Sequence, residues 1–332
     1  MTDEESVVTA IAPGDPLPAW CEPAWGLLAA RAANGTLPHA LLVCGPGGLG
    51  KRALVEMFVR ARLCETPRDG RACGSCRTCK LLSAGTHPDR MRVKLEPSPK
   101  TGVMRKEIVV DQIRELSARL AMSSQLDGWQ IAVIDPADAM NVAAQNALLK
   151  TLEEPTEASL IVLVADQPWR LSATIRSRCQ RIDIAVPPPG EAMAWLQARG
   201  VESADAVLAA AGGNPGQAWL LAEQGGMQRR QEVARDLLAL VAGRADARAI
   251  GRTWAGDEPQ QRLEQAARLL EGALRARACG ERARFDPGWN DETVAERIAD
   301  ANRLRVLLNG PLRGDLALFE WLERLPASRQ GL

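Results

Sequence analysis

Short apolar runs alternate with helical patterns over residues 1–186. Three of the runs, at residues 40–44, 130–134 and 160–164, contain at most one polar side chain each. Strands of a parallel sheet that is covered on both faces have this continuous apolar character, and helices connect such strands. The pattern therefore predicts an α/β domain with a parallel sheet over residues 1–186.

The chain changes character at the Pro-Pro-Pro-Gly run of residues 187–190. Beyond it, apolar residues recur only at helical spacing, in segments separated by glycine, asparagine and proline. Residues 187–227 predict a small helical lid domain, and residues 228–332 predict an all-helical C-terminal domain. The helices are expected near residues 191–199, 204–211, 215–221, 229–242, 258–278, 291–308 and 315–325.

A glycine-rich loop follows the first apolar run. Gly-Pro-Gly-Gly-Leu-Gly-Lys-Arg, residues 45–52, stands between the expected strand and a helical stretch at residues 53–62. This order of strand, loop and helix is that of a Walker A loop, whose backbone N–H groups and lysine bind phosphates. The candidate nucleotide-binding residues are Gly45, Gly47, Gly50 and Lys51. A relic loop that holds no nucleotide is the alternative.

Two groups that ATP hydrolysis needs are missing from this pattern. Arg52 stands where a Ser or Thr hydroxyl would hold Mg²⁺. Asp135 follows the second apolar run in the place of a Walker B carboxylate, but Pro136 replaces the glutamate that would activate water. Asp135 is therefore either a metal ligand or the N-cap of a helix that begins at Pro136. Without the hydroxyl and the base the barrier to phosphoryl transfer stays high, so no intrinsic ATPase activity is expected.

Four of the eight cysteines are clustered within residues 64–79 as Cys64, Cys73, Cys76 and Cys79. Four thiolates at this spacing form the closed tetrahedral ligand set of structural Zn²⁺, which leaves no open position for catalysis. A substitute ligand at His87 and a pair of disulfides are the alternatives.

Charge and hydropathy exclude two classes of protein. Lys plus Arg equals Asp plus Glu at 41 each, so the chain lacks the overall positive field of a free-standing nucleic-acid binder. The acidic first residues lead into no apolar signal segment, and no apolar stretch approaches the length of a bilayer span, so a cytoplasmic location without membrane contact is expected. In a reducing compartment the clustered cysteines are expected to bind metal rather than to form disulfides.

Several motifs together resemble the AAA+ clamp-loader family of bacterial DNA polymerase III. They are LPHALL at residues 37–42, the degenerate loop, the cysteines followed by GTHPD at 85–89, VDQIR at 110–114, NALLKTLEEP at 146–155 and TIRSRC at 174–179. The last two are highly specific, and the resemblance runs in order over about residues 24–222. Members that hydrolyse ATP, the gamma and tau forms, keep the loop hydroxyl, the acid after the Walker B aspartate and a sensor arginine where this chain has Gly216. The three losses are typical of a non-hydrolysing member.

The resemblance implies a role and a set of partners. Residues 177–179, Ser-Arg-Cys, match the motif that places an arginine finger in the ATP site of a neighbouring subunit, so Arg178 is the implied catalytic residue in trans. The implied protein is a non-hydrolysing part of the DNA polymerase holoenzyme. It abuts a gamma/tau subunit on its finger side and the delta subunit elsewhere, its helical C-terminal domain forms part of a collar, and it helps load the sliding clamp onto primed DNA. Residues 110–114 with Arg105 and Lys106 are a candidate DNA-contacting stretch.

Three alternatives stay open. The chain could be an ATP-hydrolysing subunit of the gamma/tau type, or a small-molecule kinase or zinc-dependent nucleic-acid enzyme that uses the loop for phosphoryl transfer. Arg178 could be part of an ordinary surface ion pair near Arg176 and Arg181.

Overall fold

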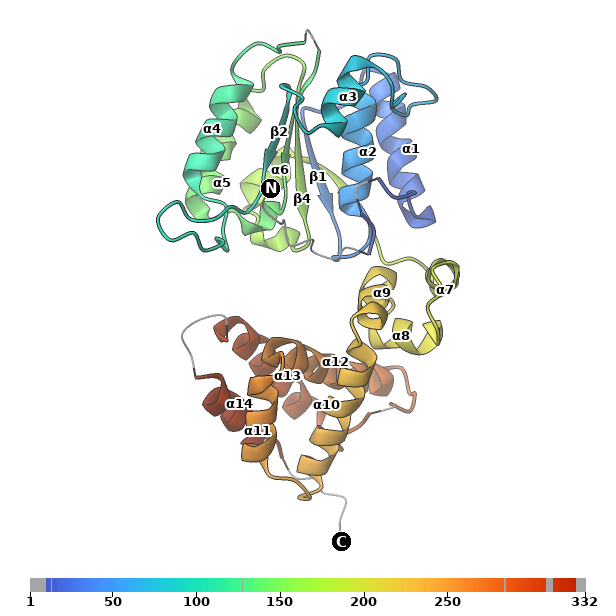
Figure 1. The fold of residues 1–332 in the computed structure, drawn as a ribbon, viewed down its shortest axis with the longest axis vertical. Coiled ribbons are helices and arrows are strands. Elements are labelled where there is room, and N and C mark those ends of the chain that lie inside the picture. Colours follow the sequence, from blue (N-terminus) through green and yellow to red (C-terminus); the bar gives the residue numbers. More distant parts are fainter. Residues whose placement is uncertain (1–9, 13, 127, 284, 309–312, 327–332) are drawn as a thin grey trace. The chain divides into compact units, whose positions relative to one another are not determined.

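The computed structural model describes residues 10–12, 14–126, 128–283, 285–308 and 313–326. The chain divides into two compact units, which are labelled by element in Figure 1. The first unit extends to Trp195 and includes Asn214–Gly216, and the second comprises Leu196–Gly213 and the residues from Gln217 onward. The three-domain division at residues 187 and 228 stays a prediction.

A five-stranded sheet forms the centre of the first unit. Its strand order is β2-β3-β4-β1-β5, and all of the neighbouring pairs are parallel. Every residue of the three central strands is buried, which explains why these strands were visible as continuous apolar runs and confirms the predicted parallel sheet. The strands are β1 (Ala40–Cys44), β2 (Arg90–Val93), β3 (Gln130–Ile134), β4 (Ser159–Ala165) and β5 (Gln180–Asp183).

Helices cover both faces of this sheet, as Figure 1 shows for α1, α2 and α3 on one side and α4 and α5 on the other. Successive residues of a strand point to opposite faces, so Leu41 and Val43 pack with α1 and α2, whereas Leu42 packs with α4 and α5. The helices up to the unit boundary are η1 (Ala19–Cys21), α1 (Glu22–Ala33), α2 (Lys51–Leu63), α3 (Arg77–Ser83), α4 (Val110–Leu120), η2 (Ala137–Ala139), α5 (Val142–Glu153), η3 (Pro168–Arg170), α6 (Ala173–Arg178) and α7 (Pro189–Ala198).

The remaining elements are all helical among the described residues, as predicted. They are α8 (Ala204–Ala210), α9 (Pro215–Glu223), α10 (Gly226–Val241), α11 (Ala247–Gly256), α12 (Pro259–Ala278), α13 (Asp291–Leu307) and α14 (Gly314–Glu323). In the part of the chain that the structure describes, no helix has both the length and the apolar character that crossing a bilayer requires.

One helix of the second unit, α11, was not predicted. A Cβ at its Gly251 would lie 3.1 and 3.2 Å from the backbone N and Cα of Phe319, so the missing side chain lets α14 approach closely. Trp254 of the same helix is fully buried, lies 6.4 Å from the ring of Trp321 and donates from Nε1 to Asp236 at 3.0 Å. The core of the second unit is thus assembled around Trp254.

Candidate functional site

The phosphate loop leaves the carboxyl end of β1 and enters α2, as its sequence predicts. Its first glycine is held tightly: Gly45 has φ 146°, and a Cβ there would lie 2.1 Å from the carbonyl oxygen of Ile184. Only glycine fits this backbone position. The start of the loop is therefore fixed against the backbone that follows β5, and the capacity of the loop to bind a phosphate depends on the side chains around it.

The loop lysine is neutralised by this chain itself. Lys51 is 2% exposed, and its Nζ donates to the carbonyl oxygens of Gly45 at 2.6 Å and Pro46 at 2.7 Å. The same ammonium forms a 2.6 Å ion pair with Oδ1 of Asp166, the first residue after β4. A carboxylate of the chain thus holds the cation that would otherwise bind a phosphate.

Asp166 was missed by the sequence analysis because it belongs to none of the motifs considered. A signal was present, since Asp166 follows a buried strand just as Asp135 does. The strands β3, β4 and β1 are parallel neighbours, so the residues at their carboxyl ends meet at one edge of the sheet. Both carboxylates are therefore brought to the phosphate loop.

Arg52 occupies the space beside the Walker B carboxylate. Its Nε lies 3.0 and 2.9 Å from the two carboxylate oxygens of Asp135, and its Nη2 lies 2.8 Å from Oδ1. Burial acts to lower the pKa of Arg52, but Asp135, followed by Asp166 and Asp138, outweighs burial and raises it. The buried carboxylate of Asp135 is therefore paired with a permanent cation of the chain.

The alternative that Asp135 caps a helix beginning at Pro136 is wrong. The next element is the 3₁₀ turn η2, which receives no side-chain cap, and α5 begins only at Val142. The true cap of α5 is Asn141, whose Oδ1 accepts from the backbone N–H of Ala144 at 2.9 Å. The side chain of Asp135 is directed to Arg52 instead.

The segment Asn214–Gly216 closes over the loop within the first unit. Asn214 donates from Nδ2 to the carbonyl oxygen of Gly47 at 2.9 Å. A Cβ at Gly216 would lie 1.9 Å from the carbonyl oxygen of Gly48, so no side chain fits there while the loop keeps this position. Members of the resembled family that hydrolyse ATP have a sensor arginine at this position. In this chain the close contact with Gly48 leaves no room for an arginine side chain.

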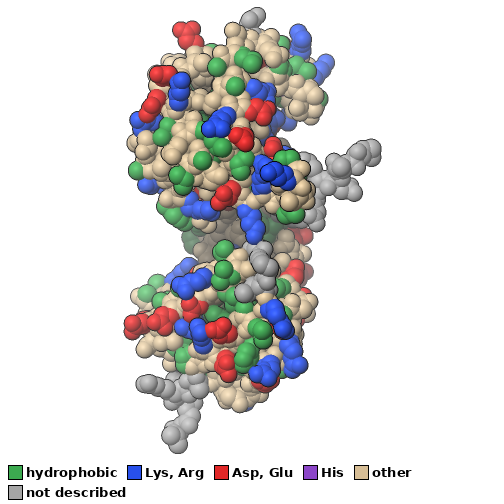
Figure 2. All heavy atoms as spheres, turned by 90° about the vertical axis from the view of Figure 1, so that its left-hand side faces the viewer, with side chains coloured by type: hydrophobic (Ala, Val, Ile, Leu, Met, Phe, Trp, Pro, Cys, Tyr) green, Lys and Arg blue, Asp and Glu red, His purple; other side chains and the backbone are tan. Residues whose placement is uncertain are grey.

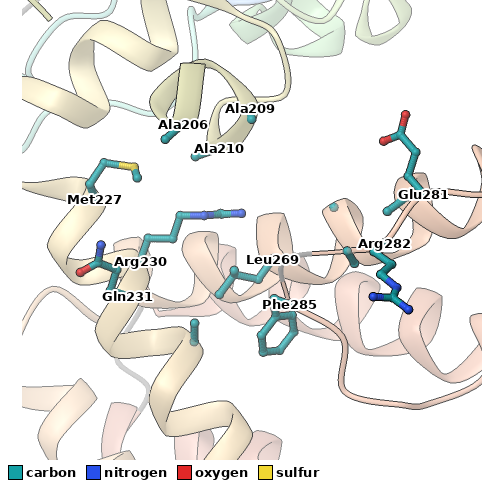
Figure 3. A pocket seen from close by; sticks show the side chains of 14 residues that line it. Ala206, Ala209, Ala210, Met227, Arg230, Gln231, Leu269, Glu281, Arg282 and Phe285 are labelled. Carbon is teal, nitrogen blue, oxygen red and sulfur yellow. The ribbon is translucent and has the colours of Figure 1, made fainter. Parts of the chain in front are cut away.

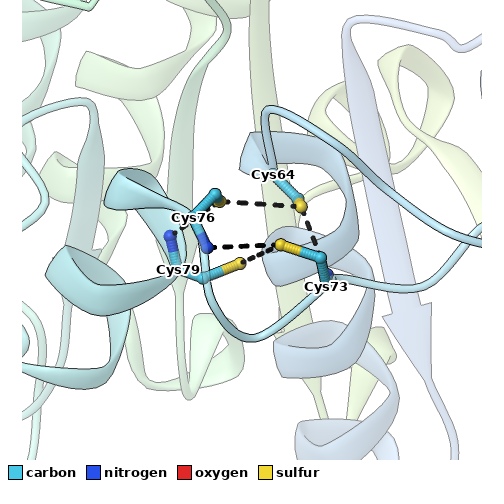
Figure 4. Close-up of side chains that lie close together, drawn as sticks. All are labelled: Cys64, Cys73, Cys76 and Cys79. Carbon is cyan, nitrogen blue, oxygen red and sulfur yellow. Dashed lines mark hydrogen bonds between the residues drawn. The ribbon is translucent and has the colours of Figure 1, made fainter.

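The four clustered cysteines converge as predicted (Figure 4). Their sulfur atoms all lie within 4.8 Å of one another, with Cys64 Sγ to Cys76 Sγ at 3.8 Å and Cys73 Sγ to Cys79 Sγ at 4.0 Å. A tetrahedral zinc site with Zn–S bonds of about 2.3 Å places its sulfurs about 3.8 Å apart. The donor set fits Zn²⁺ in both element and spacing.

Backbone amides support the anionic form of these sulfurs. The N–H groups of Cys73, Cys76 and Cys79 donate to the sulfurs of Cys64, Cys73 and Cys76 at 3.3, 3.3 and 3.4 Å. The pKa of Cys73 is lowered to about 5 by the Thr66 side chain and then by backbone amides, whereas burial raises the pKa of Cys79 to about 12. A divalent cation would supply the charge that lets all four ionise together.

Both alternatives for the cysteine cluster fail. All eight cysteines are free, so the paired disulfides are excluded. His87 is not part of the sulfur cluster, because it is buried elsewhere and its Nδ1 accepts from the backbone N–H of Asp89 at 3.2 Å. The burial of His87 lowers its pKa and keeps its ring neutral.

Arg178 is the last residue of α6, a short helix that begins after Ser172. Its Nη2 lies 2.6 Å from Oε1 of Glu153, and its Nη1 donates to the carbonyl oxygen of Thr174 at 3.2 Å. The side chains of Arg178 and Glu153 are 35% and 49% exposed, so water competes for both. An ion pair this exposed contributes about 0–1 kcal/mol, and another anion can replace Glu153 at little cost.

The candidate DNA-contacting stretch begins α4. Arg114 lies 3.5 Å from Asp111 of the same helix, and both side chains are largely exposed. On the face drawn in Figure 2, basic and acidic side chains are interspersed, in keeping with the balanced composition. The contact of residues 110–114, Arg105 and Lys106 with DNA stays a prediction.

Comparison with known proteins places these features in a family. A family model described as "DNA polymerase III, delta subunit" matches residues 21–188, about half of the chain. The chain is 40% identical to DNA polymerase III subunit delta' of Pseudomonas aeruginosa over 71% of this chain and 70% of that protein. It is 37% identical to subunit delta' of Escherichia coli over 66% of this chain and 64% of that protein.

A tau subunit is also similar, over a smaller share of the chain. Subunit tau of Bacillus subtilis is 32% identical over 44% of this chain and 24% of that protein. The two delta' relatives match about two thirds of the chain or more, at higher identity. This chain therefore belongs to the delta prime family of clamp-loader subunits of DNA polymerase III.

Proposed function

We propose that this chain is an AAA+-type clamp-loader subunit that does not hydrolyse ATP and that donates Arg178 to the ATP site of a neighbouring gamma/tau subunit. In the assembled complex, with gamma/tau and delta subunits, it helps place the sliding clamp on primed DNA in the cytoplasm. The observation that carries the proposal is the pair of internal ion pairs at the phosphate loop, Lys51 with Asp166 and Arg52 with Asp135.

The pair of Lys51 and Asp166 opposes nucleotide binding. Asp166 already pairs with the Nζ atom of Lys51. A phosphate that bound the same Nζ atom would lie next to the Asp166 carboxylate, which has the same sign of charge. Two like charges about 4 Å apart repel by ~4 kcal/mol at an effective dielectric constant of ~20, which corresponds to a loss of about a thousandfold in affinity. The relic-loop interpretation is therefore preferred over nucleotide binding through Gly45, Gly47, Gly50 and Lys51.

The pair of Arg52 and Asp135 opposes hydrolysis. Mg²⁺ in a hydrolysing site is held by a hydroxyl after the lysine and by the Walker B carboxylate, and it bridges the transferring phosphates. Here the hydroxyl is replaced, and the carboxylate is engaged by a guanidinium on both of its oxygens. A guanidinium supplies positive charge but cannot coordinate phosphate and water together as the metal does. The gamma/tau-type alternative and the kinase alternative both need that metal.

Arg178 is suited to act in trans because its ion pair with Glu153 of the same chain is weak. An arginine that stabilises the charge of a transferring phosphoryl group accelerates the reaction by about 10³–10⁵ in well-studied systems, which is ~4 kcal/mol or more. That gain exceeds the ~1 kcal/mol at most that the exposed pair with Glu153 contributes. The ion pair with Glu153 can therefore be the position that an arginine finger occupies before the neighbouring ATP site is formed.

We further propose that Cys64, Cys73, Cys76 and Cys79 hold a structural Zn²⁺. The cluster ties the end of α2 to the start of α3, because Cys64 directly follows α2 and Cys76 is the N-cap of α3. Four thiolates complete the coordination, so the metal would stabilise this connection and take no part in catalysis.

The first prediction concerns the loop. The double substitution Arg52→Thr and Asp166→Asn removes the guanidinium that occupies the metal position and the carboxylate that occupies the phosphate position. The variant is therefore expected to bind ATP at least ~100-fold more tightly than the parent. This binding should require Mg²⁺, because the new hydroxyl is a ligand for that ion. The variant should still not hydrolyse ATP, because Pro136 leaves no base. Isothermal titration calorimetry measures the binding. The matched control exchanges Arg181→Thr and Asp183→Asn, an ion pair of β5, and should leave binding unchanged. Equal binding by both variants would contradict the proposal.

The second prediction concerns Arg178. In a reconstituted clamp loader, Arg178→Ala should slow single-turnover ATP hydrolysis at the neighbouring site by at least ~10²-fold, because a guanidinium is lost from the transition state. Arg178→Lys should restore only part of the rate, since it keeps the charge but lacks the planar fork. Arg176→Ala, on the same helix and exposed, is the control and should hydrolyse normally. Normal turnover with Arg178→Ala would refute the arginine finger.

The third prediction concerns the metal. The purified chain should contain one equivalent of zinc by mass spectrometry, and Cys76→Ser should lose it, because three thiolates hold the ion less tightly than four. Loss of zinc should also increase proteolysis within residues 64–79. The control is Cys279→Ser, which removes an exposed thiol outside the cluster. A chain that lacks zinc yet resists proteolysis in this segment would contradict the assignment.

A further inference from the structure

A cavity of about 420 Å³ lies in the second unit between α8, α10 and α12 (Figure 3). Cavities that bind small molecules typically enclose about 300–1,000 Å³. Most of the lining residues on the three facing helices have small side chains, which leave the space between the helices unfilled. These residues are Ala206, Ala209 and Ala210 of α8, Ala234 of α10, and Gly272 and Ala276 of α12.

Three charged side chains line this space, namely Arg230 and the exposed Glu281 and Arg282. Arg230 of α10 extends between α8 and Leu269 of α12 (Figure 3). Its Nη1 is buried and has no hydrogen-bond partner among the described residues. The neighbouring Arg262, by contrast, is paired with Asp257 and Glu232. Arg230 thus has no carboxylate partner among the described residues, whereas Arg262 has two.

A half-buried guanidinium without a counter-ion is unfavourable. Water is removed from Nη1, and nothing of the chain replaces the hydrogen bonds that this atom loses. Burial, and then the charge of Arg268, lower the pKa of Arg230 to about 10. An anion in the cavity would therefore interact favourably with the charge of Arg230, and an apolar group attached to that anion would contact the apolar walls.

We propose that this cavity binds a monocarboxylate with an apolar body, the carboxylate on Arg230 and the body against the alanines, Leu269 and Phe285. The guanidinium of Arg230 can hold one carboxylate through two parallel N–H···O hydrogen bonds. Arg230, Arg282 and Glu281 together give the lining a net charge of +1, so a doubly charged phosphate would remain half-neutralised there, and nucleotides and free phosphate fit poorly. The inference is independent of the proposed clamp-loader function.

The same chemistry is offered by a free medium-chain acid and by the carboxyl terminus of a peptide. The full chain is therefore titrated by calorimetry with octanoate and, separately, with acetyl-Leu-Leu. Methyl octanoate and the amide of acetyl-Leu-Leu serve as uncharged controls. At least one of the two acids should bind, and its uncharged counterpart should bind at least tenfold more weakly. Failure of both acids, or equal binding of acid and neutral counterpart, would overturn the proposal.

Two variants assign the binding to Arg230. Arg230→Met should weaken binding of the acid at least tenfold, whereas Arg235→Met, an exposed arginine on the same helix, should leave it unchanged. Without ligand, Arg230→Met should melt at or above the temperature of the parent, because no partner of the chain is lost. Arg262→Met should melt lower, because it leaves Asp257 and Glu232 unpaired. Unchanged binding by Arg230→Met, or a lowered melting temperature of that variant, would refute the proposed site.

Discussion

Two buried charges at the carboxyl edge of the sheet require partners, and the chain supplies both from its own sequence. Lys51 is 2% exposed and Asp135 is 7% exposed, so either charge left alone would destabilise the fold. In a nucleotide-hydrolysing loop these partners are phosphate and Mg²⁺. Here they are Asp166 and Arg52. Folding alone thus gives both charges a partner from within the chain.

The surroundings of Arg52 and Arg178 differ in the way that the two proposed roles require. Arg52 is bonded to both carboxylate oxygens of the buried Asp135, so the fold fixes the position of Arg52. Arg178 faces a carboxylate that is 49% exposed and is held through one oxygen and one backbone carbonyl. Only the second arrangement can be exchanged for a phosphate on a neighbouring chain. These two features support the proposal that the subunit assists catalysis in its neighbour while its own loop stays inactive.

The sequence predicted the features that have a local pattern and missed those that depend on distant contacts. The three central strands were found because they are apolar on both faces, whereas the edge strands Arg90–Val93 and Gln180–Asp183 carry exposed polar residues and gave no such run. The helix α11 was missed because Gly251 interrupts its pattern, and the reason for that glycine lies in Phe319. The four cysteines were found from their spacing. The pairing of Arg52 with Asp135, 83 residues apart, and the role of Asp166 emerged only from the fold.

The most direct test of the central claim is the thermal unfolding of the unmodified chain with and without Mg²⁺-ATP. A site with a Kd in the micromolar range would stabilise the chain by ~4 kcal/mol at a thousandfold excess over Kd, which raises the melting temperature by several degrees. The internal ion pairs predict no shift at millimolar Mg²⁺-ATP. A shift of several degrees would show that a nucleotide displaces Asp166 and Arg52, and it would contradict the account.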